Sequence, residues 1–336
     1  MAVTIKDVAR ETNLAISTIS KYMNGGNVRD ENKELIENAV HKLGYSPNNM
    51  ARGLRTSKSY TIGLIAGNID NPHLVALLSE MESKLRELGY SLTYASHDGD
   101  PKQAKEYVDY MVEKGVDGII VDPIGDGTEY LRSVRENKIP LVIVEDRCEE
   151  AGDSVQVDCA GGAYEIVEHL IKAGHTRIAV IQGTQSRLTA RERFCGYSRV
   201  MEDYGYPICE DYVIDGDFSY TAGYEGMNKL WSLNKRPTAV FVTNYDMCLG
   251  AMTAINTLGI KVPEELSIVS FDDFELSVMV RPKLTTVKQP LVQVADAACE
   301  ILHRRINGDY SDFPQKIRIK PECIYRDSVR RCYKKE

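Results

Sequence analysis

The sequence predicts a small all-α head followed by an α/β body of two doubly wound lobes with parallel sheets. Two short segments with apolar residues at helical spacing lie between residues 4 and 26, separated by a break at Asn13-Leu14. From Tyr60 onward, short β-branched runs alternate with stretches of helical length, which is typical of parallel sheets with helices on both faces. About ten such units are too many for one small sheet, and a chain of 336 residues is expected to hold two or three domains.

The head has the pattern of a helix-turn-helix. Apolar residues recur at helical spacing in both of its segments: Ile5, Val8 and Ala9 in the first, and Ile16, Ile19 and Met23 in the second. Two short helices joined this tightly must cross steeply, with the second projecting outward. This geometry places a helix in the major groove of DNA, so the head is predicted to bind DNA.

The alternation in the body fixes the expected strands and helix ends. Seven β-branched runs predict strands at residues 61–66, 91–96, 118–121, 141–144, 177–183, 239–243 and 267–271. Glycine favours the left-handed residue that ends many helices. Six glycines stand where the intervening helices should stop: Gly89, Gly115, Gly174, Gly205, Gly259 and Gly308.

Charge and composition narrow the class of protein. The net charge is −8, but residues 1–58 hold nine Lys/Arg and six Asp/Glu, a net of +3, which leaves −11 for the rest. A basic head on an acidic body fits a protein that meets phosphates only at one end. The eight cysteines form no CxxC pair, so we expect no zinc or thiol-redox site and mostly buried, reduced thiols. We expect no metal or other cofactor.

Location follows from the apolar runs. No run of 18 apolar residues exists, so no membrane span and no membrane partner are expected. The N-terminal MAVTIKDVAR lacks the apolar core of a signal peptide, so a cytoplasmic protein is predicted.

The segment between head and body predicts a conditional helix. Pro47 ends the preceding structure, and Asn48 or Asn49 is suited to cap a short helix that carries Gly53 in its interior. A helix this short is unstable alone, so we expect it to form only when DNA holds it.

Ordered motifs along the whole chain connect these features to a known family. They include TIKDVA at 4–9, STISKYMN at 17–24, LGYSPNNMARGLR at 43–55, IDNPH at 69–73, RFCG at 193–196, TNYDMCLGAM at 243–252, ELSIVSFDD at 265–273 and KLTTVKQP at 283–290. The sequence resembles the LacI/GalR family of bacterial transcription regulators. The resemblance implies a helix-turn-helix head, a hinge helix and a two-lobed core like that of periplasmic sugar-binding proteins.

The resemblance also implies domain boundaries. We expect a DNA-binding domain at 1–46, a hinge helix at 47–59, an N-terminal lobe at 60–159 plus 290–320, and a C-terminal lobe at 160–289 plus 322–336. The chain should cross between the lobes near 158–161, 288–290 and 320–322, so strands near 284–288 and 316–320 should belong to different lobes.

The DNA-reading residues are implied by matching position. Ile16, Ser17 and Lys21 would face base edges, and Thr18 and Ser20 would touch phosphates. Leu54 would wedge into a minor-groove base step and kink the duplex. The remaining expected DNA contacts are Thr4, Asn24, Asn48, Ala51 and Arg52. The alternatives are a solvated helix face for Lys21 and a linker residue packed on the core for Leu54.

Two departures from the family bear on the operator. Lys21 stands where the family usually has Arg, and Lys lacks the rigid fork that reads guanine. Ala15 stands where Ser is favoured, so it cannot cap the recognition helix.

An effector site is expected where strands end, because open α/β sheets bind ligands at the carboxyl ends of their strands. Six polar residues follow predicted strands: Asn71, His73, Asp122, Asp146, Asn244 and Asp272. The resemblance implies that Arg193, Asn244 and Asp272 hold the effector and that Phe218 stacks on it. The VEDR segment leaves Asp146 and Glu145 as alternatives. For any one of these residues, a helix cap or a lobe-to-lobe hydrogen bond is the competing interpretation.

The sequence therefore predicts a dimeric transcription regulator, a repressor, that binds a pseudo-palindromic DNA operator and responds to a small effector, expected to be a sugar or sugar derivative. The short, basic end RDSVRRCYKKE favours a dimer over a tetramer. One alternative is the same regulator with a vestigial cleft and a protein partner. An enzyme is not expected, because no GxSxG, P-loop, HExxH or paired Cys/His motif is present.

Overall fold

The computed structural model describes residues 3–23, 26–45, 58–125, 127–146 and 152–332. The chain divides into two compact units, Met1–Tyr60 and Thr61–Glu336. No helix within the described ranges is long and apolar enough to cross a membrane.

The first unit is a three-helix head, made of α1 (Ile5–Thr12), α2 (Ile16–Met23) and α3 (Asp30–Leu43). Asn13 ends α1 in the left-handed conformation, at φ 56°, which turns the chain sharply into α2. The head closes around four buried side chains, one or two from each helix: Val8, Ile19, Ile36 and Ala39. The helix-turn-helix predicted from residues 4–26 is therefore present, and α3 completes its core.

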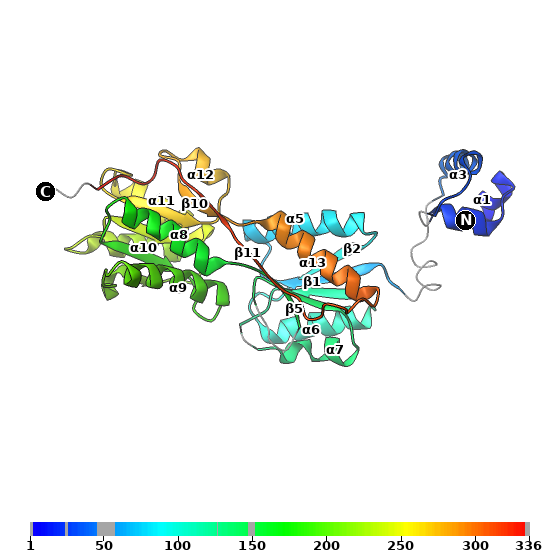
Figure 1. Ribbon diagram of the computed structural model, residues 1–336, viewed down its shortest axis with the longest axis horizontal. Helices are drawn as coiled ribbons and strands as arrows, with labels where there is room; N and C mark the ends of the chain where they lie inside the picture. Colours follow the sequence, from blue (N-terminus) through cyan, green and yellow to red (C-terminus); the bar gives the residue numbers. More distant parts are fainter. Residues whose placement is uncertain (1–2, 24–25, 46–57, 126, 147–151, 333–336) are drawn as a thin grey trace. The chain divides into compact units, whose positions relative to one another are not determined.

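The second unit begins with a six-stranded, all-parallel sheet, whose region is called the N-terminal lobe (Figure 1). Its strand order is β11-β5-β4-β3-β1-β2. The strands are β1 (Thr61–Ala66), β2 (Ser91–Ser96), β3 (Gly118–Val121), β4 (Leu141–Val144), β5 (Asp153–Val157) and β11 (Lys316–Ile319). Helices α5 (Pro72–Glu87) and α13 (Leu291–Ile306) pack together on one face, and α6 (Pro101–Glu113) and α7 (Arg132–Glu136) on the other.

A second six-stranded sheet forms the C-terminal lobe, with the strand order β12-β10-β9-β8-β6-β7. The strands are β6 (Ile178–Gln182), β7 (Val213–Asp215), β8 (Ala239–Val242), β9 (Ser267–Phe271), β10 (Thr285–Lys288) and β12 (Glu322–Ile324), with only the β10–β12 pair antiparallel in the described part of the sheet. Helices α8 (Cys159–Lys172) and α9 (Leu188–Asp203) pack as one pair, and α10 (Tyr220–Ser232) and α11 (Tyr245–Leu258) as another. The short α12 (Glu275–Met279) follows β9.

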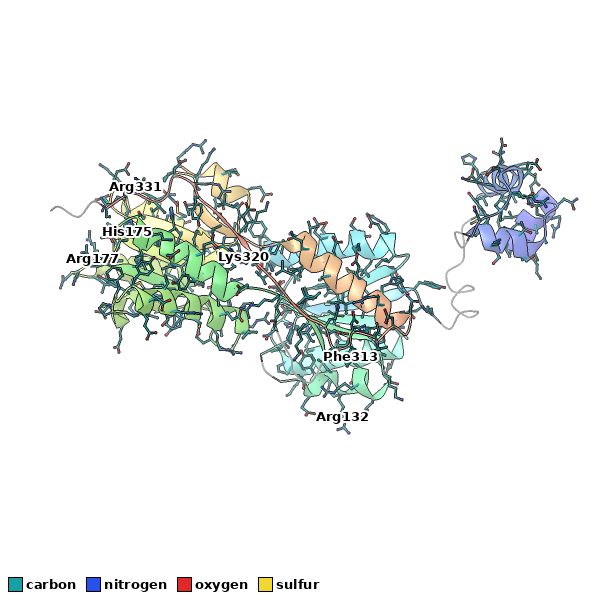
Figure 2. The ribbon with its side chains drawn as sticks, in the orientation of Figure 1. Arg132, His175, Arg177, Phe313, Lys320 and Arg331 are labelled. Atoms are coloured by element: carbon teal, nitrogen blue, oxygen red, sulfur yellow. The ribbon has the colours of Figure 1, made fainter. Side chains whose placement is uncertain are left out.

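The chain passes between the two sheets at three points: from β5 to α8, from β10 to α13 and from β11 to β12. Lys320 lies on the last of these crossings (Figure 2) and pairs with Glu165 of α8, at 2.9 Å between Nζ and Oε2. β10 and β11 thus belong to different sheets, as the expected crossings require.

Buried polar contacts fix the order of elements in the N-terminal lobe. Asp153, at the start of β5, accepts two hydrogen bonds from the Arg305 guanidinium of α13, at 2.8 and 3.0 Å. Both side chains are 1% exposed, and the same carboxylate accepts the backbone N–H of Gln315 just before β11. One carboxylate therefore holds α13, β5 and β11 together.

The predicted helix ends are confirmed, but the predicted burial of the cysteines is not. All six predicted helix-stop glycines have φ between 67° and 94°. The expectation of mostly buried cysteines is wrong for the described part of the chain. Cys159, Cys248 and Cys299 are buried, but Cys195 and Cys209 are exposed, because they lie on the outward sides of their segments.

Candidate functional sites

The second helix of the head presents a polar face with one large apolar side chain on it. Ile19 is fully buried in the core, whereas Ile16 is 43% exposed. Ser17 and Lys21 are exposed beside Ile16, and Thr18 and Ser20 are half-buried. An isoleucine that does not serve the core is suited to contact a thymine methyl group in the major groove.

Thr4 lies at the start of α1 and is engaged within the head. Its backbone N–H and its hydroxyl both donate to one carboxylate oxygen of Asp7, at 2.9 and 2.7 Å. These hydrogen bonds lower the pKa of Asp7. Five other expected DNA contacts lie outside the described residues: Asn24, Asn48, Ala51, Arg52 and Leu54.

The body contains a cavity of about 390 Å³ whose wall comes from both lobes. Seven of the eight expected effector residues line it: Asn71, His73, Asp122, Arg193, Phe218, Asn244 and Asp272. The topology explains why they converge. In each sheet the strand order reverses at one point, between β1 and β3 and between β6 and β8, and ligands bind outside the carboxyl ends of strands at such points.

The expected eighth residue, Asp146, is corrected to Glu145. Glu145 lines the cavity, whereas Asp146 is buried and is not among the lining residues. The cause is a three-residue turn after β4, in which the Asp146 N–H donates to the Val144 carbonyl at 2.7 Å and Glu145 takes φ 63°. This turn places the Glu145 side chain in the cavity wall.

Three lining residues have left-handed backbones that their side chains disfavour. The φ angles are 63° at Glu145, 70° at Phe218 and 75° at Asp272. Such conformations cost of order 1–3 kcal/mol each and gather at ligand sites. Gly183 makes room for the Phe218 ring, because a Cβ at Gly183 would lie 2.2 Å from Phe218 Cε1.

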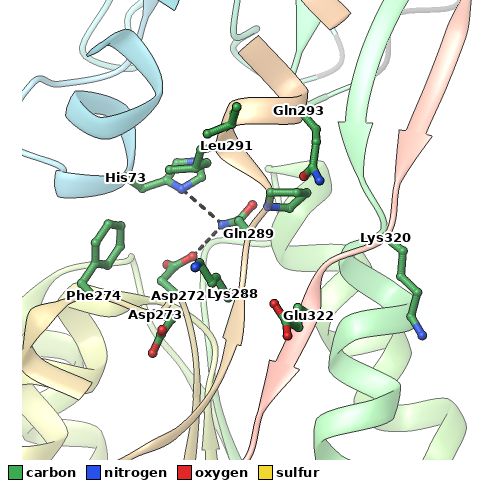
Figure 3. Close-up of a pocket in the computed structure, with 12 residues that line it drawn as sticks. His73, Asp272, Asp273, Phe274, Lys288, Gln289, Leu291, Gln293, Lys320 and Glu322 are labelled. Atoms are coloured by element: carbon green, nitrogen blue, oxygen red, sulfur yellow. Dashed lines mark hydrogen bonds between the residues drawn. The ribbon is translucent and has the colours of Figure 1, made fainter. Parts of the chain in front are cut away.

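Gln289 connects the two lobes at the back of the cavity. Its amide nitrogen donates to Asp272 Oδ1 at 2.6 Å and lies 3.3 Å from His73 Nδ1. Figure 3 shows these contacts from a second pocket, which shares His73, Asp272 and Gln289 with the cavity. Asp272 belongs to the C-terminal lobe, and His73 lies in the first turn of α5 in the N-terminal lobe. The second Asp272 oxygen accepts the backbone N–H of Tyr245 at 3.2 Å. Gln289 therefore connects a side chain of each lobe from the crossing between β10 and α13.

His73 is also held by a carboxylate, with 3.4 Å between its Nε2 and Glu145 Oε1. Burial alone would lower the pKa of His73, but the charge and hydrogen bonding of Glu145 outweigh it, so the pKa is raised. Burial conversely favours neutral Glu145, but His73 outweighs it and the pKa of Glu145 is lowered. The two side chains form a charged pair in the cavity wall.

Arg193 is 5% exposed and rests against an aromatic ring. Its guanidinium lies 3.9 Å from the centre of the Phe271 ring, and Nη1 donates to the Thr243 carbonyl at 2.6 Å. Arg193 Nε has no partner among the described residues. A buried donor without a partner is costly, and the guanidinium lies in the wall of the cavity.

Arg187 connects the lobes across the cavity mouth and was not singled out from the sequence. It immediately precedes α9 of the C-terminal lobe, and its Nη2 donates to Asp122 Oδ1 at 2.6 Å. Its Nη1 donates to the Pro123 carbonyl at 2.7 Å. Burial raises the pKa of Asp122, and the Arg187 charge opposes that shift.

His97 stands beside Asp122 in the N-terminal lobe. Its Nδ1 accepts the Gly99 N–H at 3.0 Å, so Nε2 carries the proton and donates to the Asp122 carbonyl at 3.0 Å. Burial lowers the pKa of His97, which keeps the imidazole neutral. In the described ranges, no group of three His, Cys, Asp or Glu side chains is placed to hold a metal ion.

The fold and these sites define a class of protein: a helix-turn-helix head attached to a two-lobed core with a cavity between its lobes. The head matches the family of bacterial regulatory proteins called the lacI family over residues 4–48, and the body matches a periplasmic binding protein-like domain over residues 167–329. The repressor PurR of Haemophilus influenzae is 33% identical over 97% of this chain and 98% of its own. The regulator DegA of Bacillus subtilis is 34% identical over 98% of both chains.

The chain belongs to the LacI family of bacterial regulatory proteins. It is a DNA-binding transcriptional repressor and not an enzyme. Solved structures share its fold. A complex of the regulator CelR with cellobiose has a TM-score of 0.74 at 25% identity, covering 97% of this chain and 99% of its own. The lac repressor dimer bound to operator has a TM-score of 0.83 at 24% identity, covering 98% and 100%.

Proposed function

We propose that two copies of this chain bind a pseudo-palindromic operator and that a carbohydrate bound between the lobes controls this binding. The observation that carries the proposal is the interlobe cavity, whose wall combines buried donors, buried acceptors and the Phe218 ring. Vicinal hydroxyls need paired donors and acceptors, and a sugar ring packs on an aromatic face. The similar CelR structure holds cellobiose, which supports a ligand of this class.

The DNA side of the proposal rests on α2 and on the segment after the head. Ile16, Ser17 and Lys21 would face base edges, Thr18 and Ser20 would contact phosphates, and Thr4 would lie near the backbone. Leu54 would enter the minor groove, with Asn48, Ala51, Arg52 and Asn24 contributing further contacts. A two-fold operator needs two heads, which favours a dimer. A DNA-binding role supports the cytoplasmic location expected from the sequence.

A thermal-shift screen of the intact chain against neutral sugars, sugar phosphates and nucleosides tests the effector site. A ligand at 100 times its dissociation constant stabilises by about 2.7 kcal/mol, a shift that is easily measured. For a hit, Arg193→Ala and Asp272→Asn should each weaken binding about 10- to 100-fold, because each removes a hydrogen bond to a charged group.

The exposed Arg199, also on α9, supplies a matched control: Arg199→Ala should leave the affinity unchanged. An equal loss in all three variants would mean that the ligand binds elsewhere. A panel without any hit would count against a carbohydrate effector and would favour the vestigial cleft with a protein partner.

A further inference from the structure

The ionisable side chains of the interlobe cavity carry an excess of negative charge. Four carboxylates line it, from Asp122, Glu145, Asp217 and Asp272, against the two guanidinium groups of Arg187 and Arg193. A charged His73 adds one positive charge, so the lining remains net negative. An anionic ligand would enter this cavity against the field of its own wall.

The cationic side chain best placed to bind an anion, Arg187, already forms an ion pair with Asp122. Arg187 sits at the N-terminus of α9, which has no side-chain cap, and such an end favours negative charge. Asp122 reaches this position from the opposite lobe and takes Arg187 Nη2 at 2.6 Å. The carboxylate therefore fills the place that a phosphate group would need.

The cavity wall contains both a hydrogen-bond donor and a hydrogen-bond acceptor without a partner among the described residues. Within the described residues, Arg193 Nε is a buried donor without a partner and Gln289 Oε1 is a buried acceptor without one. A hydroxyl group both donates and accepts, so it is compatible with a wall that presents atoms of both kinds. The terminal oxygens of a phosphomonoester dianion only accept, so they would be repelled by Gln289 Oε1.

We propose that the cavity selects an uncharged polyhydroxylated ligand over its phosphorylated form, and that Asp122 is the residue that excludes the phosphate by neutralising Arg187. This inference rests on the proposed small-molecule control of the repressor. Its test needs neither DNA nor knowledge of the natural effector, so it can fail while the proposed function stands.

The probe is inorganic phosphate, titrated into the intact chain in a calorimeter. Wild type should show no saturable binding in the millimolar range, and Asp122→Asn should bind phosphate at least about tenfold more tightly, a change of 1.4 kcal/mol. Removing the guanidinium in the double variant Asp122→Asn, Arg187→Gln should abolish that binding. Asp211→Asn removes one charge at an exposed position away from the cavity and should behave as wild type.

Two results would overturn the proposal. The first is that phosphate binds wild type as tightly as it binds Asp122→Asn. The second is that Asp122→Asn has the melting temperature of wild type, which shows that it is folded, but gains no affinity for phosphate. Asp122→Ser gives a second neutral variant if the amide disturbs folding. The affinity of wild type is also compared for two sugars and their phosphorylated forms: glucose with glucose 6-phosphate, and ribose with ribose 5-phosphate. Tighter binding of either phosphorylated sugar than of its parent to wild type would also contradict it.

Discussion

At the scale of single residues, the His73–Glu145 pair makes stability depend on pH. The pKa of His73 is raised above its ordinary 6.5, so its contribution is complete below that value and is lost as pH rises through the folded pKa. The pKa of Glu145 is lowered below its ordinary 4.5, so its contribution is complete above that value and is lost as pH falls through the folded pKa. The pair therefore contributes most to the free energy of unfolding between pH 4.5 and pH 6.5.

We predict that His73→Gln destabilises the body by roughly 3 kcal/mol near pH 6, because it leaves a buried carboxylate without its partner. Wild type loses the charged pair at high pH, so the difference from the variant should shrink toward pH 9. Urea unfolding at both pH values measures this. His303→Gln, on α13 and away from the cavity, is the control. A loss that is the same at both pH values would show that packing, and not charge, is responsible.

Most of the candidate effector site follows from the sequence because strand ends converge at one edge of a parallel sheet. Five side chains placed by this rule line the cavity, and two more, Arg193 and Phe218, were expected from the family resemblance. Predicting that Glu145 lines the cavity would have required knowledge of the turn after β4. The left-handed residue of this turn is Glu145 itself, so no glycine in the sequence indicates the turn. Arg187 and Gln289 could not be predicted, because Asp122 and His73, which they approach, are distant in the sequence and only the folded chain brings them together.

At the scale of elements, two glycines set the distance between α10 and α11. A Cβ at Gly250 would lie 1.9 Å from the Tyr220 carbonyl oxygen, and one at Gly223 would lie 2.0 Å from that of Met247. Alanine normally stabilises a helix by about 1 kcal/mol relative to glycine. Here the new methyl group meets backbone, which cannot move aside as a flexible side chain can.

We therefore predict that Gly250→Ala destabilises the body by a net 1–2 kcal/mol or so, since overpacking costs typically 1–3 kcal/mol and exceeds the gain in helix propensity. Thermal unfolding of the intact chain measures the change. Asn256→Ala is the control, because Asn256 is exposed on the same helix and should lose nothing. If Gly250→Ala proves as stable as Asn256→Ala, the close approach of the two helices is not what the glycine serves.

Several strands that the sequence predicted are runs of apolar residues buried on both faces. β3, β4 and β8 are buried at every position, and their runs were recognised. β7 and β12 have three residues each and lie at the sheet edges, so they carry too little apolar pattern to be distinguished from loops. β5 begins with Asp153, whose burial depends on Arg305 from a distant helix. Long-range pairing, and not local propensity, decides such strands.

At the scale of the whole molecule, control requires that the cavity and the operator-binding surface share one equilibrium. A ligand shifts that equilibrium only by its differential affinity for the two states. The Arg187–Asp122 pair joins the lobes, so a ligand that replaces or reinforces it changes how the lobes are held. The coupling between two such sites must be reciprocal for binding free energies.

We predict that operator DNA changes the affinity for the sugar found in the screen by the same factor that the sugar changes the affinity for DNA, about 5- to 150-fold. Weakening in both directions identifies an inducer, and strengthening in both identifies a corepressor. Operator affinity is measured by fluorescence anisotropy with and without sugar, and sugar affinity by calorimetry with and without operator, at one fixed salt concentration because phosphate contacts are salt-dependent. Arg193→Ala should remove the effect of the sugar on DNA while leaving affinity without sugar intact. Equal sugar affinity in the presence and absence of operator would contradict control through this cavity, even if the head still bound DNA.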